Sequence, residues 1–241
     1  MTTRFDFAGK VVLVSGVGRA GQIGNAIALA FGGAGARIVA CDRNAVGVAE
    51  RVKEFQAQGI EARPAAGDLT EPDVAKLCVE IAVKQFGQLD AVINVAGGLT
   101  TYGPIEGTDL TAFEREIAIN LKTAYLLSKS AIEALAATRG AIVNFASVAY
   151  YQPAPQMAIY AAAKAGVAGM TQSLALELLG RGIRVNAVAP GMVRTADNVA
   201  SAGPGARFVE LKQITDAVLF LASDAGAGIS GHILPVTGGA T

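Results

Sequence analysis

Residues 11–24 read Val-Val-Leu-Val-Ser-Gly-Val-Gly-Arg-Ala-Gly-Gln-Ile-Gly. The β-branched run at 11–14 predicts a buried parallel strand, and residues 25–33 predict a helix with one apolar side. A glycine turn between a strand and a helix is typical of an anion site, because free backbone N–H groups and the helix dipole point at a pyrophosphate. Glycines also serve ordinary tight turns, so this turn alone is a weak signal of dinucleotide binding.

Strands and helices alternate along the rest of the chain in the same way. Apolar or β-branched runs predict further strands at 36–41, 60–64, 89–93, 141–146, 184–189 and 231–236, and helical patterns fall between them. This alternation predicts an α/β fold: a single-domain, Rossmann-like, doubly wound parallel sheet of about seven strands with helices on both faces. No Pro- or Ser-rich linker divides the chain, so we expect one domain over residues 1–241.

The composition argues against several classes of function. The 241 residues are 52% apolar, carry no net charge and have a sequence pI of about 6.6, so nothing points to nucleic acid or an anionic membrane as a partner. No apolar stretch is long enough to span a bilayer, and the N-terminus lacks an apolar signal core. Cys41, Cys78 and the single His232 lack metal-ligand spacing, so we expect no metal and a reducing, cytoplasmic location.

Tyr160 and Lys164 stand four residues apart with only alanines between them, which places them on one face of a predicted helix. An ammonium beside a phenol favours the phenolate. Moving the pKa of Tyr from ~10 to about 7 takes roughly 3 units, or about 4 kcal/mol. Ser147 ends the predicted strand 141–146, where its hydroxyl can donate to a substrate carbonyl oxygen. A Tyr-x-x-x-Lys pair alone is weak, because such pairs occur on many helices.

Together, the glycine turn, Ser147 and the Tyr160–Lys164 pair resemble the short-chain dehydrogenase/reductase family, and the resemblance covers nearly the whole chain. It implies hydride transfer between a nicotinamide cofactor and a secondary alcohol or ketone, with Tyr160 as general acid/base. Lys164 would lower the pKa of Tyr160 and hold the nicotinamide ribose, and Ser147 would hydrogen-bond the reacting oxygen. Asn120 matches the family's fourth catalytic residue, whose backbone holds a water at a kinked helix. Its alternative role is to satisfy a helix irregularity.

The glycine turn departs from the usual pattern of the family. The first and last glycine positions, Gly16 and Gly24, are eight residues apart rather than six, and Gln22 occupies the position of the middle glycine. The enoyl-reductase branch of the family has this longer spacing. The two extra residues change the expected pyrophosphate contacts without removing the site.

The resemblance also implies which residues hold the cofactor. Besides Tyr160 and Lys164, they are Ser15, Gly16, Gln22, Ile23, Gly24, Asp42, Arg43, Asp68, Leu69, Asn94, Ala96, Gly97, Pro190, Gly191, Val193 and Thr195.

Asp42 directly follows the predicted strand 36–41. A carboxylate there accepts hydrogen bonds from the ribose hydroxyls and repels a 2′-phosphate. The alternative is a helix N-cap, a role for which Asn44 competes. Arg43 could pair with a phosphate, as could Arg19 in the glycine turn. We expect NAD in preference to NADP.

The polar, glycine-rich segment 196–207 occupies the place of the family's substrate lid, and the family assembles as a homotetramer. Small apolar residues on more than one side of the helices 121–137 and 157–179 agree with such an assembly. We expect the substrate pocket to be apolar, lined by Leu99, Tyr150, Tyr151, Gln152, Met157 and Met192.

Three functions compete. The first is an NAD-dependent alcohol dehydrogenase or ketone reductase. The second is a carrier-protein-linked reductase of fatty-acid type, either 3-oxoacyl or enoyl. The long glycine turn favours the enoyl branch, but that branch usually sets its Tyr further from the Lys than the four residues found here. The third is a catalytically silent nucleotide sensor, which a missing catalytic residue would support; none of the four is missing.

Overall fold

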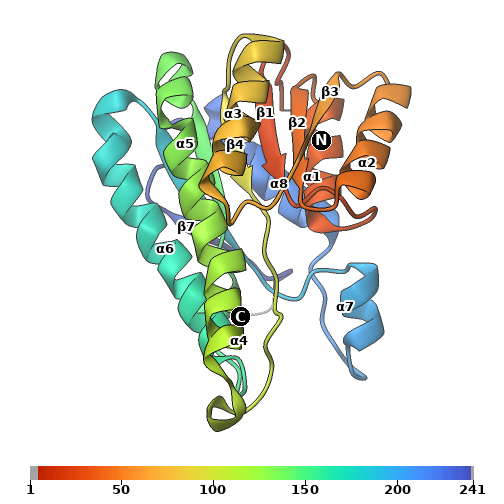
Figure 1. Cartoon of the computed structure of the whole chain (residues 1–241), viewed down its shortest axis with the longest axis vertical. Helices are drawn as coiled ribbons and strands as arrows, with labels where there is room; N and C mark the ends of the chain where they lie inside the picture. The colour runs from red at the N-terminus through yellow and green to blue at the C-terminus, as the bar shows by residue number, and fades with distance from the viewer. Residues whose placement is uncertain (1–4, 240–241) are drawn as a thin grey trace.

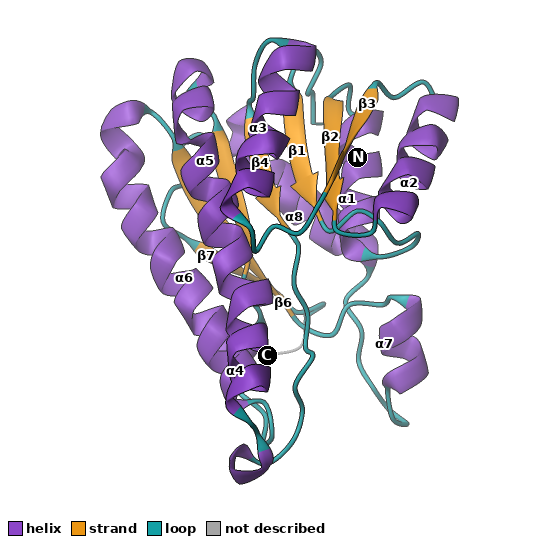
Figure 2. Ribbon diagram, viewed as in Figure 1, coloured by secondary structure: helices purple, strands orange, loops and turns teal. Residues whose placement is uncertain are grey.

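The computed structural model describes residues 5–239, so the ends of the predicted domain, 1–4 and 240–241, lie outside the described residues. Its centre is a seven-stranded sheet in the order β3-β2-β1-β4-β5-β6-β7, in which every neighbouring pair is parallel (Figure 2). The direction in which strands are added reverses between β1 and β4. The predicted doubly wound parallel sheet is therefore confirmed, and its switch point lies at these two strands.

The strands are β1 (Val11–Ser15), β2 (Arg37–Asp42), β3 (Ala62–Ala66), β4 (Ala91–Asn94), β5 (Ala141–Phe145), β6 (Arg184–Pro190) and β7 (Ile233–Val236). The α-helices are α1 (Ile23–Gly33), α2 (Ala45–Ala57), α3 (Pro72–Phe86), α4 (Leu110–Ile117), α5 (Thr123–Thr138), α6 (Ala158–Leu178), α7 (Ala196–Ser201) and α8 (Leu211–Ala222). A π-helical segment, η2 (Ala118–Lys122), joins α4 to α5, and a 3₁₀ turn, η3 (Val148–Tyr150), follows β5.

The helices form two layers, one on each face of the sheet (Figure 1). Helices α1, α2 and α8 bury apolar side chains such as Phe31, Phe55 and Ile214 against one face. Helices α3, α5 and α6 cover the other face, with Leu127 and Leu178 among their buried residues. Because the central strands are buried on both faces, their sequences are continuous apolar runs rather than alternating ones.

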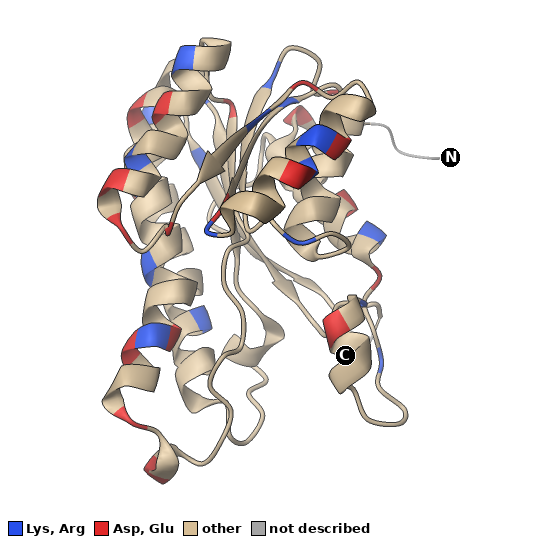
Figure 3. Ribbon diagram, turned by 45° about the vertical axis from the view of Figure 1, so that its right-hand side comes forward, with Lys and Arg blue, Asp and Glu red and all other residues tan. Residues whose placement is uncertain are grey.

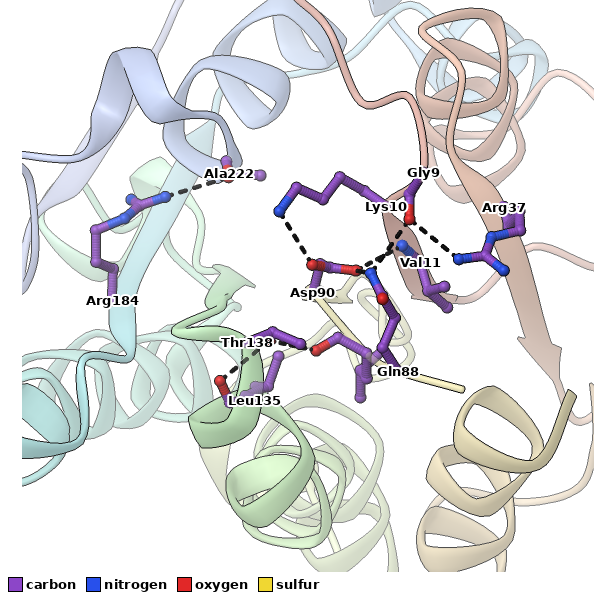
Figure 4. A network of polar contacts seen from close by, with 11 residues as sticks. Gly9, Lys10, Val11, Arg37, Gln88, Asp90, Leu135, Thr138, Arg184 and Ala222 are labelled. Carbon is purple, nitrogen blue, oxygen red and sulfur yellow. Dashed lines mark hydrogen bonds and ion pairs between the residues drawn. The ribbon is translucent and has the colours of Figure 1, made fainter. Parts of the chain in front are cut away.

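Polar side chains tie the amino ends of β1, β2 and β4 together (Figure 4). The Asp90 carboxylate accepts hydrogen bonds from the Val11 amide at 2.8 Å, from Gln88 Nε2 at 2.6 Å and from Lys10 Nζ at 3.2 Å. Arg37 Nη2 donates to the carbonyl of Gly9 at 3.0 Å. This network lies at the amino ends of the strands. An open α/β sheet binds its ligands at the other edge, at the carboxyl ends of the strands.

The carboxyl edge is extended by α4 and α7, which project beyond the ends of the strands (Figure 1). Helix α7 lies within the predicted lid segment 196–207 and forms because the Thr195 hydroxyl accepts a hydrogen bond from the Asn198 amide, an N-cap contact. In Figure 3, basic and acidic residues are interspersed along the helices, in keeping with the zero net charge. None of the helices described is long and apolar enough to cross a membrane.

The two cysteines are buried and in contact, with 3.3 Å between their sulfur atoms. Cys41 is the last but one residue of β2, and Cys78 lies on α3. The contact with Cys78, together with burial, raises the pKa of the Cys41 thiol well above its usual value. A buried thiol with a raised pKa is a poor nucleophile, so Cys41 is a structural residue of the core.

Candidate active site

A cleft of about 1020 Å³ opens at the carboxyl ends of β1, β2, β4, β5 and β6. Its walls include the glycine turn, the segment 95–100 after β4, the start of α6 and the helix α7. The cleft therefore lies at the switch point of the sheet, where open α/β sheets bind their ligands.

The glycine turn has the backbone geometry that a pyrophosphate site requires. Gly16 adopts a left-handed φ of +75°, and a Cβ added at Gly24 would fall 2.2 Å from the carbonyl oxygen of Gly16. Gln22 is the N-cap of α1 and makes no side-chain capping bond, so amides of the first turn stay available for an anion. Gly16, Gln22, Ile23 and Gly24 all line the cleft, and this uncapped helix end fits the pyrophosphate of a dinucleotide.

The Asp42 carboxylate lies at the end of β2, against the glycine turn. Its Oδ2 accepts a hydrogen bond from the Gly18 amide at 2.8 Å, and its Oδ1 accepts one from the Asn44 amide at 2.9 Å. Asn44 itself caps α2, since its side chain accepts from the Gly47 amide at 3.0 Å. Asn44, and not Asp42, is therefore the N-cap of α2. Each carboxylate oxygen retains a free lone pair for another donor.

Arg43, Asp68 and Leu69 line the same end of the cleft. Asp68 Oδ1 accepts a hydrogen bond from the Thr70 amide at 2.9 Å. This bond, helped by the positive charges of Arg43 and Lys122, lowers the pKa of the Asp68 carboxyl. Asp68 is thus an ionised hydrogen-bond acceptor at this end of the cleft.

Two residues predicted to hold the cofactor are buried behind the cleft instead. Ser15 Oγ accepts hydrogen bonds from the amides of Val95 at 2.9 Å and Ala96 at 3.0 Å, which fixes the segment after β4. Asn94 Nδ2 donates to Ser128 Oγ at 2.9 Å and to Asn144 Oδ1 at 2.7 Å. Both side chains brace the strand ends, while Ala96 and Gly97 line the cleft.

Pro190, Gly191, Val193 and Thr195 line the opposite end of the cleft, between β6 and α7. Val193 is held by a bridge to Val209, and the Thr195 amide donates to the Val193 carbonyl at 2.8 Å. Asp197, in the first turn of α7, forms an ion pair of 2.6 Å with Arg19 of the glycine turn. The two walls of the cleft are therefore in contact through these exposed side chains.

Ser147, Tyr160 and Lys164 meet in the cleft, as the sequence predicts. Tyr160 and Lys164 lie one turn apart on α6, with the Lys164 ammonium 5.7 Å from the centre of the Tyr160 ring. Lys164 is buried and donates to the Phe145 carbonyl at 2.8 Å, which ties it to the end of β5. Ser147 Oγ accepts from the Ala149 amide at 3.2 Å, so its hydroxyl proton remains free to be donated.

The protonation of this group differs from the sequence-based expectation that Lys164 brings the Tyr160 pKa towards 7. Burial raises the pKa of Tyr160, and the Glu116 carboxylate adds to this, while interaction with the Ser147 side chain opposes it. Burial also lowers the pKa of Lys164 to about 8, against the opposing effect of Glu116. Desolvation penalises the phenolate of Tyr160 and the ammonium of Lys164, so this environment favours the neutral phenol of Tyr160.

Asn120 does not line the cleft but lies directly behind the segment after β4. Its side chain donates to the Gly98 carbonyl at 2.9 Å and accepts from the Gly98 amide at 3.0 Å. It sits in the π-helical η2, so the predicted irregularity is present at this residue. π-Turns of this kind recur at functional sites.

Sequence reasoning missed Glu116, the last but one residue of α4. Its side chain is fully buried and accepts hydrogen bonds from the Thr100 amide at 3.0 Å and from Asn120 Nδ2 at 3.1 Å. An acidic residue between Arg115 and Ile117 resembles any solvated helix position. Only its spacing of four from Asn120, which places both on one helix face, could have indicated a link.

The reacting end of the cleft is mainly apolar. Of the expected residues, Leu99, Gln152, Met157 and Met192 line the cleft, together with Val148, Ala149 and Ala154. Tyr150 and Tyr151 do not line it; their rings pack edge to face on each other, with centroids 4.8 Å apart. Tyr150 packs instead against the small apolar cluster that contains Ala146 and Val167, and Tyr151 is exposed.

The parallel sheet, the glycine turn and the cleft at the switch point define a dinucleotide-binding protein. The family profile described as enoyl-(acyl carrier protein) reductase matches residues 16–241. A 3-oxoacyl-[acyl-carrier-protein] reductase of Thermotoga maritima is 34% identical, over 96% of this chain and 97% of that protein. A D-threitol dehydrogenase of Mycolicibacterium smegmatis is 35% identical, over 100% of this chain and 97% of that protein.

Among solved structures, a 7α-hydroxysteroid dehydrogenase complexed with NADH and 7-oxo glycochenodeoxycholic acid superimposes with a TM-score of 0.92. It is 28% identical, and the match covers 100% of this chain and 98% of that one. The chain belongs to the short-chain dehydrogenase/reductase family, whose members are oxidoreductases that use a nicotinamide cofactor.

Proposed function

We propose that this chain is an NAD-preferring dehydrogenase or reductase of small secondary alcohols and ketones, with Tyr160 as its general acid/base. The observation that carries the proposal is the convergence of Ser147, Tyr160 and Lys164 on one cleft at the carboxyl edge of the sheet. A hydroxyl donor, a titratable phenol and an ammonium are the groups that a carbonyl–alcohol interconversion requires.

The residues divide the work as follows. Ser147 donates a hydrogen bond to the reacting oxygen and keeps its proton, and Tyr160 gives a proton to a ketone or takes one from an alcohol. As a neutral phenol Tyr160 is ready to act as an acid, and the Lys164 ammonium stabilises the phenolate that remains. A bound nicotinamide supplies or accepts the hydride. The carbonyl of Phe145 holds Lys164 at the base of the site.

The cofactor would lie across the strand ends, with its pyrophosphate at the uncapped start of α1. Asp42 would accept hydrogen bonds from the adenosine ribose, and Asp68 with Leu69 would flank the adenine. Gly191, Val193 and Thr195 stand where the nicotinamide carboxamide would be held. Asn120 would act from behind, by holding Gly98 in the wall of the cleft.

The experiment is a screen of purified protein against secondary alcohols and ketones, followed by the absorbance of reduced nicotinamide. Activity with uncharged cyclic or linear alcohols, absent from the Tyr160→Phe variant, is the expected result. The apolar lining around Leu99, Met157 and Met192 favours substrates of this kind. Absence of turnover with every alcohol and ketone would refute the proposal.

A second candidate is a carrier-protein-linked reductase of fatty-acid type. It is favoured by the match to the reductase of Thermotoga maritima and by the family profile, and the spacing of four between Tyr160 and Lys164 suits the 3-oxoacyl over the enoyl reaction. Testing 3-oxoacyl and enoyl thioesters beside simple ketones separates the two: a large preference for thioesters would replace the first candidate. The silent-sensor alternative would require that neither class be turned over while cofactor still binds.

We further propose that the chain functions as one domain, with the segment 196–207 as a lid, in a cytoplasmic homotetramer. The single sheet supports one domain. The free, buried thiols support the cytoplasmic location. Exposed leucines on α4 and α6 support the assembly, because a lone subunit would leave them in water.

A further inference from the structure

The Glu116 carboxylate is an unusual feature of this cleft, because the side chain is fully buried and the reaction described above does not use it. Among residues 5–239, no Lys or Arg nitrogen lies within the 4.0 Å of an ion pair with it. A buried charge is costly unless hydrogen bonds or an opposite charge compensate it. The groups that compensate Glu116 therefore indicate what the residue does.

The side-chain hydrogen bonds of Glu116 reach Thr100 in the wall of the cleft and Asn120 behind it. Thr100 donates both its amide, at 3.0 Å, and its hydroxyl to Oε2, and Asn120 Nδ2 donates to Oε1 at 3.1 Å. Asn120 in turn holds Gly98 through two further bonds. One carboxylate thus fixes both Asn120 and the segment 98–100, which lines the cleft.

The charge of Glu116 acts on the catalytic pair. Its negative field favours the protonated forms of both Tyr160 and Lys164, and for Lys164 it is the effect that opposes burial. A further charged group beside this cluster is Arg115, whose guanidinium is exposed and reaches the Thr100 carbonyl at 3.5 Å. From α6 the titratable groups that face the cluster are Tyr160 and Lys164 themselves.

We propose that Glu116 is a positioning residue for the reaction: its carboxylate holds Asn120 and the segment 98–100 in place. This inference rests on the proposed function, because it assigns Glu116 a role in support of residues proposed to be catalytic. It predicts that the charge and the hydrogen bonds of Glu116 have separable effects.

The first test is Glu116→Gln, which keeps the size of the side chain and removes the charge. The matched control is Glu114→Gln, an exposed carboxylate on the same helix. We expect Glu116→Gln to fold and to lose at least tenfold in kcat, with KM changed little. The alkaline pH above which activity falls should be lower in this variant than in wild type. The direction follows because the Lys164 ammonium gives up its proton more readily without the negative charge beside it.

A purely structural role would lower the melting temperature and leave both kcat and the alkaline pH limit unchanged. Equal kcat and equal pH limits in Glu116→Gln and Glu114→Gln would overturn the proposal. If Glu116→Gln does not fold, Thr100→Val decides, because it removes a donor to the carboxylate and keeps the charge. We expect it to lose at least threefold in kcat; a wild-type kcat would contradict the positioning role.

The affinity for NADH, followed by its fluorescence, provides a readout that does not need turnover. In Glu116→Gln the pH above which NADH affinity falls should be lower than in wild type, and an unchanged pH would count against the proposal. If the wild-type chain turns over no substrate, the proposed function fails, while this binding measurement still decides the role of Glu116.

Discussion

The Gly18 amide donates a 2.8 Å hydrogen bond to Oδ2 of Asp42, so the carboxylate is fixed against the glycine turn. A Cβ added at Gly18 would fall 2.7 Å from the Asp42 Cγ, which shows how closely the two residues approach. A 2′-phosphate on the cofactor would meet this fixed negative charge. A free ribose would instead donate its two hydroxyls to it.

We therefore predict that NAD is preferred over NADP by at least about tenfold in kcat/KM, or about 1.4 kcal/mol. Asp42→Ala should narrow the preference, because it removes the repulsion and leaves Arg43 free to pair with a phosphate. Steady-state kinetics with both cofactors and one substrate measure it, with the exposed Asp73→Ala as control. A wild-type preference for NADP would show that Asp42 does not select the cofactor.

Tyr160→Phe should reduce turnover by about 10²–10⁴-fold, the range typical of a lost general acid/base. Cofactor affinity should stay close to wild type, because the ring and its packing remain. Single-turnover kinetics and NADH fluorescence measure the two effects separately. Activity within a few-fold of wild type would remove Tyr160 from the mechanism.

Lys164 gives a pH dependence whose sign is fixed by its environment. Burial lowers its pKa to about 8, so the ammonium is present below that pH and is lost as the pH rises through it. Cofactor affinity should therefore weaken above about pH 8. Lys164→Ala should bind cofactor weakly at every pH and show no such step. A step of equal size in wild type and Lys164→Ala would assign it to another group.

The segment 196–207 should gain protection from hydrogen exchange when cofactor and substrate bind together, since closing lids exclude water from such sites. Asp197→Asn should speed its exchange in the free protein by up to about five-fold, because it breaks the exposed ion pair with Arg19. Helix α2, away from α7, is the internal reference. Equal protection of 196–207 with and without ligands would argue against a lid.

The chain should form a homotetramer at micromolar concentration. Leu176 on α6 and Leu179 directly after it are 78% and 66% exposed, and Leu110 on α4 is 69% exposed. Ala165 and Gly169 lie on the same side of α6 as Leu176 and would allow close helix approach. Light scattering of Leu176→Glu should show smaller particles, whereas Val46→Glu on α2 should not. A monomeric wild-type mass would refute the prediction.

The sheet could be predicted because buried parallel strands leave continuous apolar runs in the sequence. The predicted strand 60–64 begins two residues before the observed β3, Ala62–Ala66. Ile60 belongs instead to the turn that closes α2, where its amide donates to the Phe55 carbonyl at 3.0 Å. Ser147, Tyr160 and Lys164 could be predicted because the spacing of Tyr160 and Lys164, the strand end at Ser147 and the glycine turn together resemble one family. Glu116 could not be predicted, because its buried carboxylate is satisfied by Thr100, which lies in a loop without helical or strand periodicity.

The π-turn η2 also limits how the length of this chain can change. A π-turn holds one residue more than the α-helical turn that it replaces. Deleting a residue between 118 and 122 would convert the π-turn into an ordinary α-helical turn, and α4 and α5 would keep nearly the same relative orientation. The change would fall on the π-turn itself, from which the Asn120 side chain reaches Gly98 through two hydrogen bonds. This stretch should tolerate substitutions at its exposed positions far better than any insertion or deletion, even one that makes the helix more regular.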